Sequence, residues 1–132
     1  MLKRKLRLQW KDVRFLTRKR QVFSNGIFTI FYIEQYPNRQ YHQISYLVPL
    51  AVSKRAVVRH KVKRILIAEH EKSLSSYDFW WKWYKCFVSM NKSKLAQLLA
   101  ILEKKDSTQL KNYLESEHKK TFSSFVQFLW KK

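Results

Sequence analysis

The distribution of hydrophobic and polar positions predicts three strands in the chain. Residues 27–33, IFTIFYI, are rich in β-branched and aromatic side chains and predict a strand. Residues 44–53, ISYLVPLAVS, predict a second strand, in which Pro49 lies at an edge or a bulge because proline has no N–H for the ladder. Residues 84–90 predict the third strand, and the Pro-Asn pair within 36–40 predicts a turn.

Apolar residues at helical spacing predict a helix before these strands and another between the second and third. The first covers about 12–20 and begins at Asp12. Its apolar side carries Val13, Phe15 and Leu16. The second covers 55–74, and its apolar residues fall within a sector of about 100°. They are Val58, Val62, Ile65 and Leu66.

The C-terminal third of the chain predicts further helices. Leucines between 95 and 102 have helical spacing, and so do apolar residues between 122 and 129. A shorter helix over 107–118 begins after Asp106, with a glutamine three residues on as in a capping box. Strands that flank a basic helix indicate a single α+β domain, which fits a length of 132 residues.

Charge is the most unusual property of the composition. The formal net charge is +19, so we expect a polyanionic partner, either nucleic acid or an anionic membrane. Residues 1–64 hold 16 Lys and Arg against two acids, whereas residues 65–132 hold 12 lysines against seven acids. All nine arginines lie in the first part, and the arginine fork matches phosphate oxygens and base edges. The first half therefore predicts a nucleic-acid-binding surface, and no apolar run is long enough to span a bilayer.

Several kinds of chemistry are excluded or disfavoured. Gly26 is the only glycine, which excludes glycine-rich phosphate loops. Cys86 is the only cysteine, which excludes an internal disulfide and fits a reducing, cytoplasmic location. On a strand and without an adjacent base, Cys86 is interpreted as a small buried hydrophobe.

The histidines and tryptophans are interpreted as structural. Three histidines are scattered along the chain without a second ligand at metal spacing, so we expect no zinc site: His42, His70 and His118. Three tryptophans are predicted to pack under the C-terminal helices: Trp80, Trp81 and Trp83.

The stretch VSKRAVVRHKVKR, residues 52–64, has six basic side chains and no acid. Cations at the start of a helix oppose its macrodipole, a local cost that bound phosphates would remove. Such a conflict between a sequence and its predicted element indicates function. The candidate RNA-binding residues are Lys54, Arg55, Arg59, His60, Lys61, Lys63 and Arg64.

This stretch resembles the protein subunit of bacterial ribonuclease P. The segment VSK at 52–54, followed by AVVRHKVKR at 56–64, is similar to that family's strand end and basic helix. The opening residues 7–16 and the strand residues Phe28 to Tyr32 also resemble it. The sequence departs from the family at His60 and Lys61, at Val13 and Thr17, and in lacking a glycine-containing insert after the strand lysines. The chain thus divides into a ribonuclease P protein-like domain, 1–105, and a C-terminal helical extension, 106–132.

The resemblance implies a fold like the second domain of a small-subunit ribosomal protein, with element order α-β-β-β-α-β-α and a left-handed βαβ crossover. It implies an accessory subunit without catalytic residues or a cofactor of its own, because the RNA subunit and its Mg²⁺ perform the cleavage. The protein would hold the catalytic RNA and the 5′ leader of precursor tRNA, the leader in a cleft that includes Val13, Leu16 and Tyr32. A ribosome-associated or general RNA-binding module and a basic DNA-binding protein remain alternatives.

Overall fold

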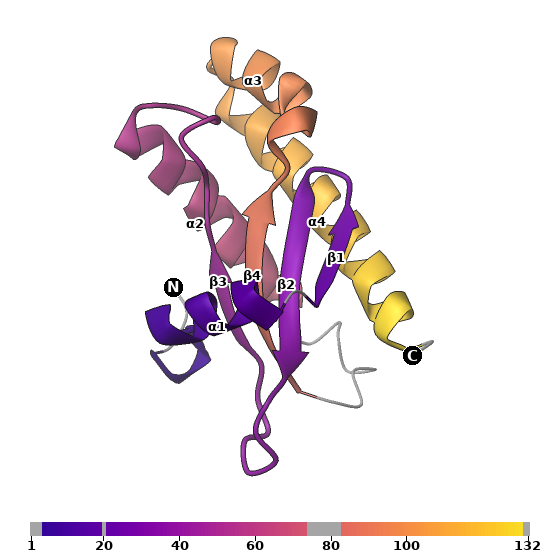
Figure 1. The fold of residues 1–132 in the computed structure, drawn as a ribbon. Helices are drawn as coiled ribbons and strands as arrows, with labels where there is room; N and C mark the ends of the chain where they lie inside the picture. Colours follow the sequence, from indigo (N-terminus) through magenta and orange to yellow (C-terminus); the bar gives the residue numbers. More distant parts are fainter. Residues whose placement is uncertain (1–3, 20, 74–82, 131–132) are drawn as a thin grey trace.

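The computed structural model describes residues 4–19, 21–73 and 83–130. Its centre is a sheet of four strands in the order β1-β2-β4-β3 (Figure 1). The strands are β1 (Val22–Asn25), β2 (Phe28–Glu34), β3 (Gln43–Tyr46) and β4 (Tyr84–Met90). β1 and β4 each pair antiparallel with β2, whereas β3 pairs parallel with β4.

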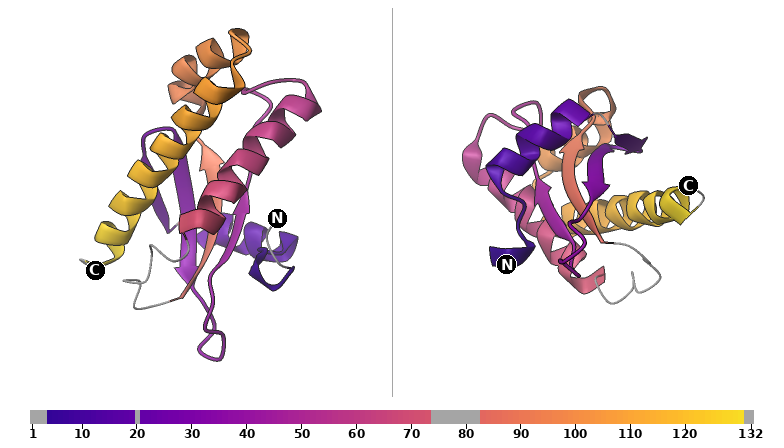
Figure 2. Two further views of the ribbon diagram at one scale, coloured as in Figure 1. Left: turned by 180° about the vertical axis from the view of Figure 1, so that it is seen from behind. Right: turned by 60° about the horizontal axis from the view of Figure 1, so that its bottom comes forward.

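Helices cover both faces of the sheet. The helical elements are η1 (Arg4–Leu6), α1 (Trp10–Lys19), α2 (Ala56–Ser73), η3 (Lys92–Lys94), α3 (Ala96–Glu103) and α4 (Ser107–Trp130). α1 lies across the lower part of one face, while α2 and α4 cover the other face (Figures 1 and 2). The predicted α+β order with four strands is confirmed.

The crossover connection from β3 through α2 to β4 has the handedness that is rare in proteins. Seen from behind, with α2 in front of the sheet, β4 stands to the left of β3 and both strands run upward (Figure 2, left). The crossover is therefore left-handed, against the strong general preference for right-handed crossovers.

Each face of the sheet has its own core, because successive residues of a strand point to opposite faces. Phe28, Ile30 and Tyr32 of β2 point toward α2 and α4 and belong to the larger core. Phe31 and Ile33 point the other way and pack against the smaller core under α1.

Two strands differ from the sequence prediction. β3 ends at Tyr46, so the strand predicted over 44–53 was too long, and Pro49 lies beyond it. Only Leu47 continues the pairing, through its N–H to the carbonyl of Val88 at 2.8 Å. β1 was not predicted from the pattern; only the family resemblance supplied a strand there.

A single helix replaces the two that the pattern predicted at the C-terminus. α4 runs unbroken from Ser107 to Trp130, and the carboxylate of Asp106 accepts hydrogen bonds from the N–H groups of Thr108 and Gln109 at 3.0 and 3.1 Å. The predicted N-cap role of Asp106 is confirmed. α4 contributes Leu110, Leu114, Phe122, Phe125 and Leu129 to the larger core. The extension therefore packs on the same core as the sheet, and a boundary at residue 105 stays a prediction.

Asn91 fastens the turn between β1 and β2 to the end of β4. Its side-chain NH₂ donates to the carbonyl oxygens of Gly26 and Phe28 at 3.0 and 3.3 Å, and its carboxamide oxygen accepts from the hydroxyl of Thr29. Gly26 is the first residue of the turn and has a φ of 56°, a conformation that glycine adopts without strain.

Candidate nucleic-acid interface

α2 presents its basic residues to solvent because the middle of its apolar side packs against the larger core. Val62 and Leu66 are 0% and 1% exposed and lie in the larger core. The first acid of α2 is Glu69, whose side chain is also buried. Residues 54–68 thus form a stretch without any carboxylate.

The start of α2 is held by Arg59. Its Nη1 donates to the carbonyl oxygens of Ser53 and Lys54 at 2.9 and 3.1 Å. The hydroxyl of Ser53 accepts the N–H of Arg55 at 3.1 Å. The half-buried Arg59 therefore stabilises the loop before α2 in addition to contributing a positive charge.

Six of the seven predicted RNA-binding residues lie together on or before α2, and one is separated from them. Five side chains are exposed: those of Lys54, Arg55, His60, Lys61 and Arg64; Arg59 and Lys63 are half-buried. Lys61 is turned toward α4, where its Nζ donates to the hydroxyl of Ser107 at 2.6 Å. We call the other six the α2 basic surface: Lys54, Arg55, Arg59, His60, Lys63 and Arg64.

Part of the opposite face of the sheet is not covered by α1. The pairing register puts Thr29 opposite Ser89, and both Phe31 and Ser45 opposite Phe87, so these residues share the face on which α1 lies. α1 crosses only the lower part of this face (Figure 1). We call the remainder the open sheet face; its residues are Val22, Ser24, Thr29, Phe31, Ser45 and Ser89, all exposed or half-buried.

The cleft residues predicted from the sequence do not line an open surface. Tyr32 is 4% exposed and lies on the other side of the sheet, with its ring 5.3 Å from that of Phe125 in α4. The prediction for Tyr32 was wrong because adjacent strand residues face opposite ways, and the accessible aromatic ring is that of Phe31. Val13 and Leu16 are also buried, since they attach α1 to the sheet. Strand alternation shows that Phe31 and Tyr32 face opposite ways, and the packing of α4 decides which of them is buried.

An ion pair fixes the orientation of α1. The Nζ of Lys85 in β4 donates to the Asp12 carboxylate at 2.9 Å and lies 4.2 Å from the centre of the Tyr36 ring. Trp10 and Arg14 are each two residues from Asp12, so they lie on the opposite flank of α1. That flank faces away from the start of β4 and toward the open sheet face, and Trp10 is 73% exposed.

The exposed charges of residues 4–18 are all positive. Asp12 is the only acid there and is paired with Lys85. The exposed cations are Arg4, Lys5, Arg7, Lys11, Arg14 and Arg18. Together with the α2 basic surface, they give the arginine-rich half of the sequence two cationic regions.

Two of the histidines that are scattered along the sequence come together in the fold. His70 of α2 and His118 of α4 lie with ring centres 6.4 Å apart, and Nε2 of His118 is hydrogen-bonded to the Tyr46 hydroxyl at 2.6 Å. Burial lowers the pKa of His70 to about 4, and burial together with repulsion from His70 lowers the pKa of His118 to about 3. Both are neutral at pH 7. No cluster of three or more potential metal-ligating His, Cys, Asp or Glu side chains occurs within 4–19, 21–73 and 83–130.

The other singled-out residues have simple environments. Cys86 is 2% exposed, as predicted, and burial raises the pKa of its thiol. Trp83 is 41% exposed and lies beside the His42 ring at 4.8 Å, so it does not pack under the C-terminal helices. Trp80 and Trp81 lie outside the described residues. None of the described helices has the length and apolar character needed to cross a bilayer.

Comparison with known proteins agrees with this arrangement. The family model described as Ribonuclease P matches residues 2–115. The solved ribonuclease P protein of Staphylococcus aureus superposes with a TM-score of 0.63 at 12% identity, covering 89% of this chain and 93% of that one. The protein from Thermotoga maritima superposes with a TM-score of 0.58 at 16% identity, covering 83% and 96%. No curated protein matches the chain by sequence. These superpositions establish a shared fold, and the family match covers most of the sequence: the chain belongs to the ribonuclease P family, as an RNA-binding protein component that serves tRNA processing.

Proposed function

We propose that the α2 basic surface binds the catalytic RNA of ribonuclease P, and that the open sheet face with the adjacent flank of α1 binds the 5′ leader of precursor tRNA. In this proposal the RNA subunit and its Mg²⁺ perform the cleavage, and the protein supplies phosphate contacts and positions the leader. The buried, unreactive thiol of Cys86 suits a reducing cytoplasm.

The observation that carries the proposal is the run of exposed cations on and before α2, with no carboxylate from residue 54 to residue 68. Because Val62 and Leu66 anchor the opposite side, these cations have no packing role that would explain their number. Phosphates docked there would relieve the mutual repulsion and contribute charge-assisted hydrogen bonds.

The open sheet face suits an unpaired strand. Half-buried Phe31 and exposed Trp10 offer ring faces, and Arg14 offers a cation beside them. Single-stranded RNA is bound by this combination of stacking rings and positive charge.

The α2 contact is tested by reconstitution with a ribonuclease P RNA at low Mg²⁺. The double variant His60→Ala/Arg64→Ala removes two exposed side chains and leaves Arg59 to hold the loop. Since a hydrogen bond to a charged group contributes about 1.5–3 kcal/mol, we expect RNA affinity to fall at least tenfold, with leader removal lost at limiting protein. The control Lys111→Ala/Lys120→Ala removes two exposed cations from α4. Equal losses in the two variants would contradict a specific α2 contact.

The leader contact is tested with precursor tRNA that has or lacks a 5′ leader. Trp10→Ala removes an exposed ring, so the fold should persist while the preference for the leader-bearing substrate falls about tenfold. Leu99→Ala, at an exposed apolar position on α3, is the control. An unchanged leader preference in Trp10→Ala would exclude stacking on this residue.

A further inference from the structure

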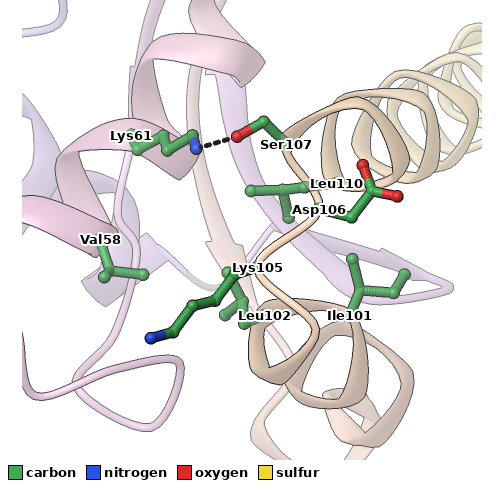
Figure 3. Close-up of a pocket in the computed structure, with 8 residues that line it drawn as sticks. All are labelled: Val58, Lys61, Ile101, Leu102, Lys105, Asp106, Ser107 and Leu110. Atoms are coloured by element: carbon green, nitrogen blue, oxygen red, sulfur yellow. Dashed lines mark hydrogen bonds between the residues drawn. The ribbon is translucent and has the colours of Figure 1, made fainter.

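A pocket of about 150 Å³ lies between the first turn of α2 and the junction of α3 with α4 (Figure 3). Its walls are apolar and come from three helices: Val58, Ile101, Leu102 and Leu110. Ile101 and Leu110 belong to the larger core, so these two walls are fixed by packing. Val58 directly precedes Arg59 of the α2 basic surface, so the pocket lies at the edge of the residues proposed to bind RNA.

The rim of the pocket carries donors and positive charge. The Nζ of Lys61 uses one of its three N–H groups on the Ser107 hydroxyl, at 2.6 Å. Lys105 extends from the α3–α4 junction toward Val58, whereas the Asp106 carboxylate points to the other side (Figure 3). The Asp106 carboxylate already accepts hydrogen bonds from the N–H groups of Thr108 and Gln109. The positive charge at the rim therefore comes from lysine side chains and not from the end of α4.

Lys105 occupies a backbone conformation that disfavours a side chain. Its φ is 53°, and among the described residues no other non-glycine residue has a positive φ. Glycine is the usual residue where a helix ends in this conformation, since it has no Cβ to strain. A lysine there places an ammonium group at the rim at the expense of backbone strain.

We propose that this pocket binds one unpaired pyrimidine base of an RNA strand that lies on the α2 basic surface. A cavity of this volume with apolar walls accommodates one six-membered ring. The two rings of a purine need more room. Lys61 and Ser107 supply donors for the ring carbonyl oxygens, and Lys105 faces the flanking phosphate. The proposal rests on the proposed function only in that the chain binds RNA.

The test uses the full chain and two single-stranded probes of equal length and charge: a twelve-nucleotide oligouridylate, and the same strand with abasic riboses at its central positions. Wild-type protein should bind the abasic probe about tenfold more weakly. Val58→Phe fills the pocket without changing the charge, so it should bind both probes with the lower affinity. Val57→Phe, on the adjacent residue that is 73% exposed, should keep the wild-type difference. Equal affinity of the wild type for both probes would overturn the proposal, and so would a persistent difference in folded Val58→Phe.

A second variant covers the case in which Val58→Phe does not fold. Lys105→Gly relieves the backbone strain, so it should raise the melting temperature and yet weaken oligouridylate binding more than Lys104→Ala, which removes an equal charge next to it. If both lysine variants bind oligouridylate equally weakly, Lys105 contributes only general charge attraction, and the proposed site is contradicted. None of these measurements depends on leader removal, so failure of the pocket and failure of the ribonuclease P role are distinguishable.

Discussion

Gly26 is the residue whose replacement the structure constrains most directly. Its φ of 56° disfavours any side chain, and an added Cβ would lie 3.1 Å from Oε2 of Glu117 in α4. Gly26→Ala should therefore lower the free energy of unfolding by about 1–2 kcal/mol. Urea unfolding measures this as a lower midpoint with an unchanged slope.

The two causes can be separated with Glu117→Ala. In that background the contact is removed and only the backbone strain remains, so the loss from Gly26→Ala should be smaller but not zero. A loss of the same size in both backgrounds would show that the contact with Glu117 contributes nothing.

Buried histidines should make the protein less stable in acid. Burial lowers the pKa of His70 to about 4 and of His118 to about 3, whereas in the unfolded chain both have values near 6.5. Below pH 6.5 the unfolded state thus binds more protons than the folded state, so stability falls as the pH is lowered from 6.5 toward 4. Between pH 7 and pH 5 each histidine should reduce the free energy of unfolding by about 2 kcal/mol.

Urea unfolding of wild type and His118→Gln at both pH values measures this effect. Glutamine keeps a polar partner for the Tyr46 hydroxyl and cannot titrate, so the variant should lose less stability than wild type between pH 7 and pH 5. The same loss in both proteins would mean that His118 has the same pKa in the folded and unfolded states, so that burial does not lower it.

Predictions for single residues succeeded where the chemistry of the side chain determines its environment. They failed where the environment depends on the direction in which the side chain points. Burial of Cys86 and capping by Asp106 follow from what those side chains do in any protein. Tyr32 and Phe31 are both aromatic, and only the direction of the sheet's faces separates them, which depends on where α4 packs. His70 and His118 are 48 residues apart in sequence, and their contact likewise depends on how α2 and α4 pack together.

At the scale of elements, a largely buried ion pair adds to the packing of Val13 and Leu16 in positioning α1. The side chains of Lys85 and Asp12 are 5% and 14% exposed. Asp12→Asn leaves the Lys85 ammonium buried without a carboxylate, so it should cost about 3 kcal/mol of stability. Hydrogen exchange at the α1 amides should accelerate with it, because the helix loses its tie to β4.

Removing both charges supplies the control for α1. The double variant Asp12→Asn/Lys85→Met should recover most of the stability, since an apolar side chain of similar length suits the buried site. If the double variant is as unstable as Asp12→Asn alone, the loss comes from the helix start and not from the uncompensated lysine.

Helices and strands were predicted best where the apolar pattern of the sequence matches the residues that are buried in the structure. β4 is buried along nearly its whole length, and its predicted bounds of 84–90 match the structure. β3 ends seven residues early because the turn that leads into α2 begins where the apolar run continues, and some apolar residues there are exposed, such as Leu50 at 67%. β1 is short and alternates between exposed and half-buried, so its sequence has no strong apolar signal.

At the scale of the whole molecule, charge should dominate RNA affinity. If about five phosphates are neutralised, the logarithm of the affinity should fall with the logarithm of the salt concentration with a slope of about −4, and a fourfold rise in salt should weaken binding roughly 250-fold. Titration of a ribonuclease P RNA at several potassium chloride concentrations measures the slope.

A charge-neutralising variant gives this measurement its control. Arg64→Ala should reduce the magnitude of the slope by about 0.9, which corresponds to the loss of one phosphate contact. Val57→Ala should leave the slope unchanged. A slope near zero for the wild type would mean that contacts other than phosphate contacts hold the RNA.

The central place of β4 also determines when the protein can fold during synthesis. β2 and β3 do not pair with each other; each is held through β4, which ends at residue 90. Until the ribosome has released that strand, the nascent chain has only the β1–β2 hairpin, and an isolated hairpin is marginal in water. The larger core waits longer still, for Phe122 and Phe125 of α4. Folding therefore follows the synthesis of α4, and a nascent chain arrested before residue 84 should be digested by protease as fast as an unfolded polymer.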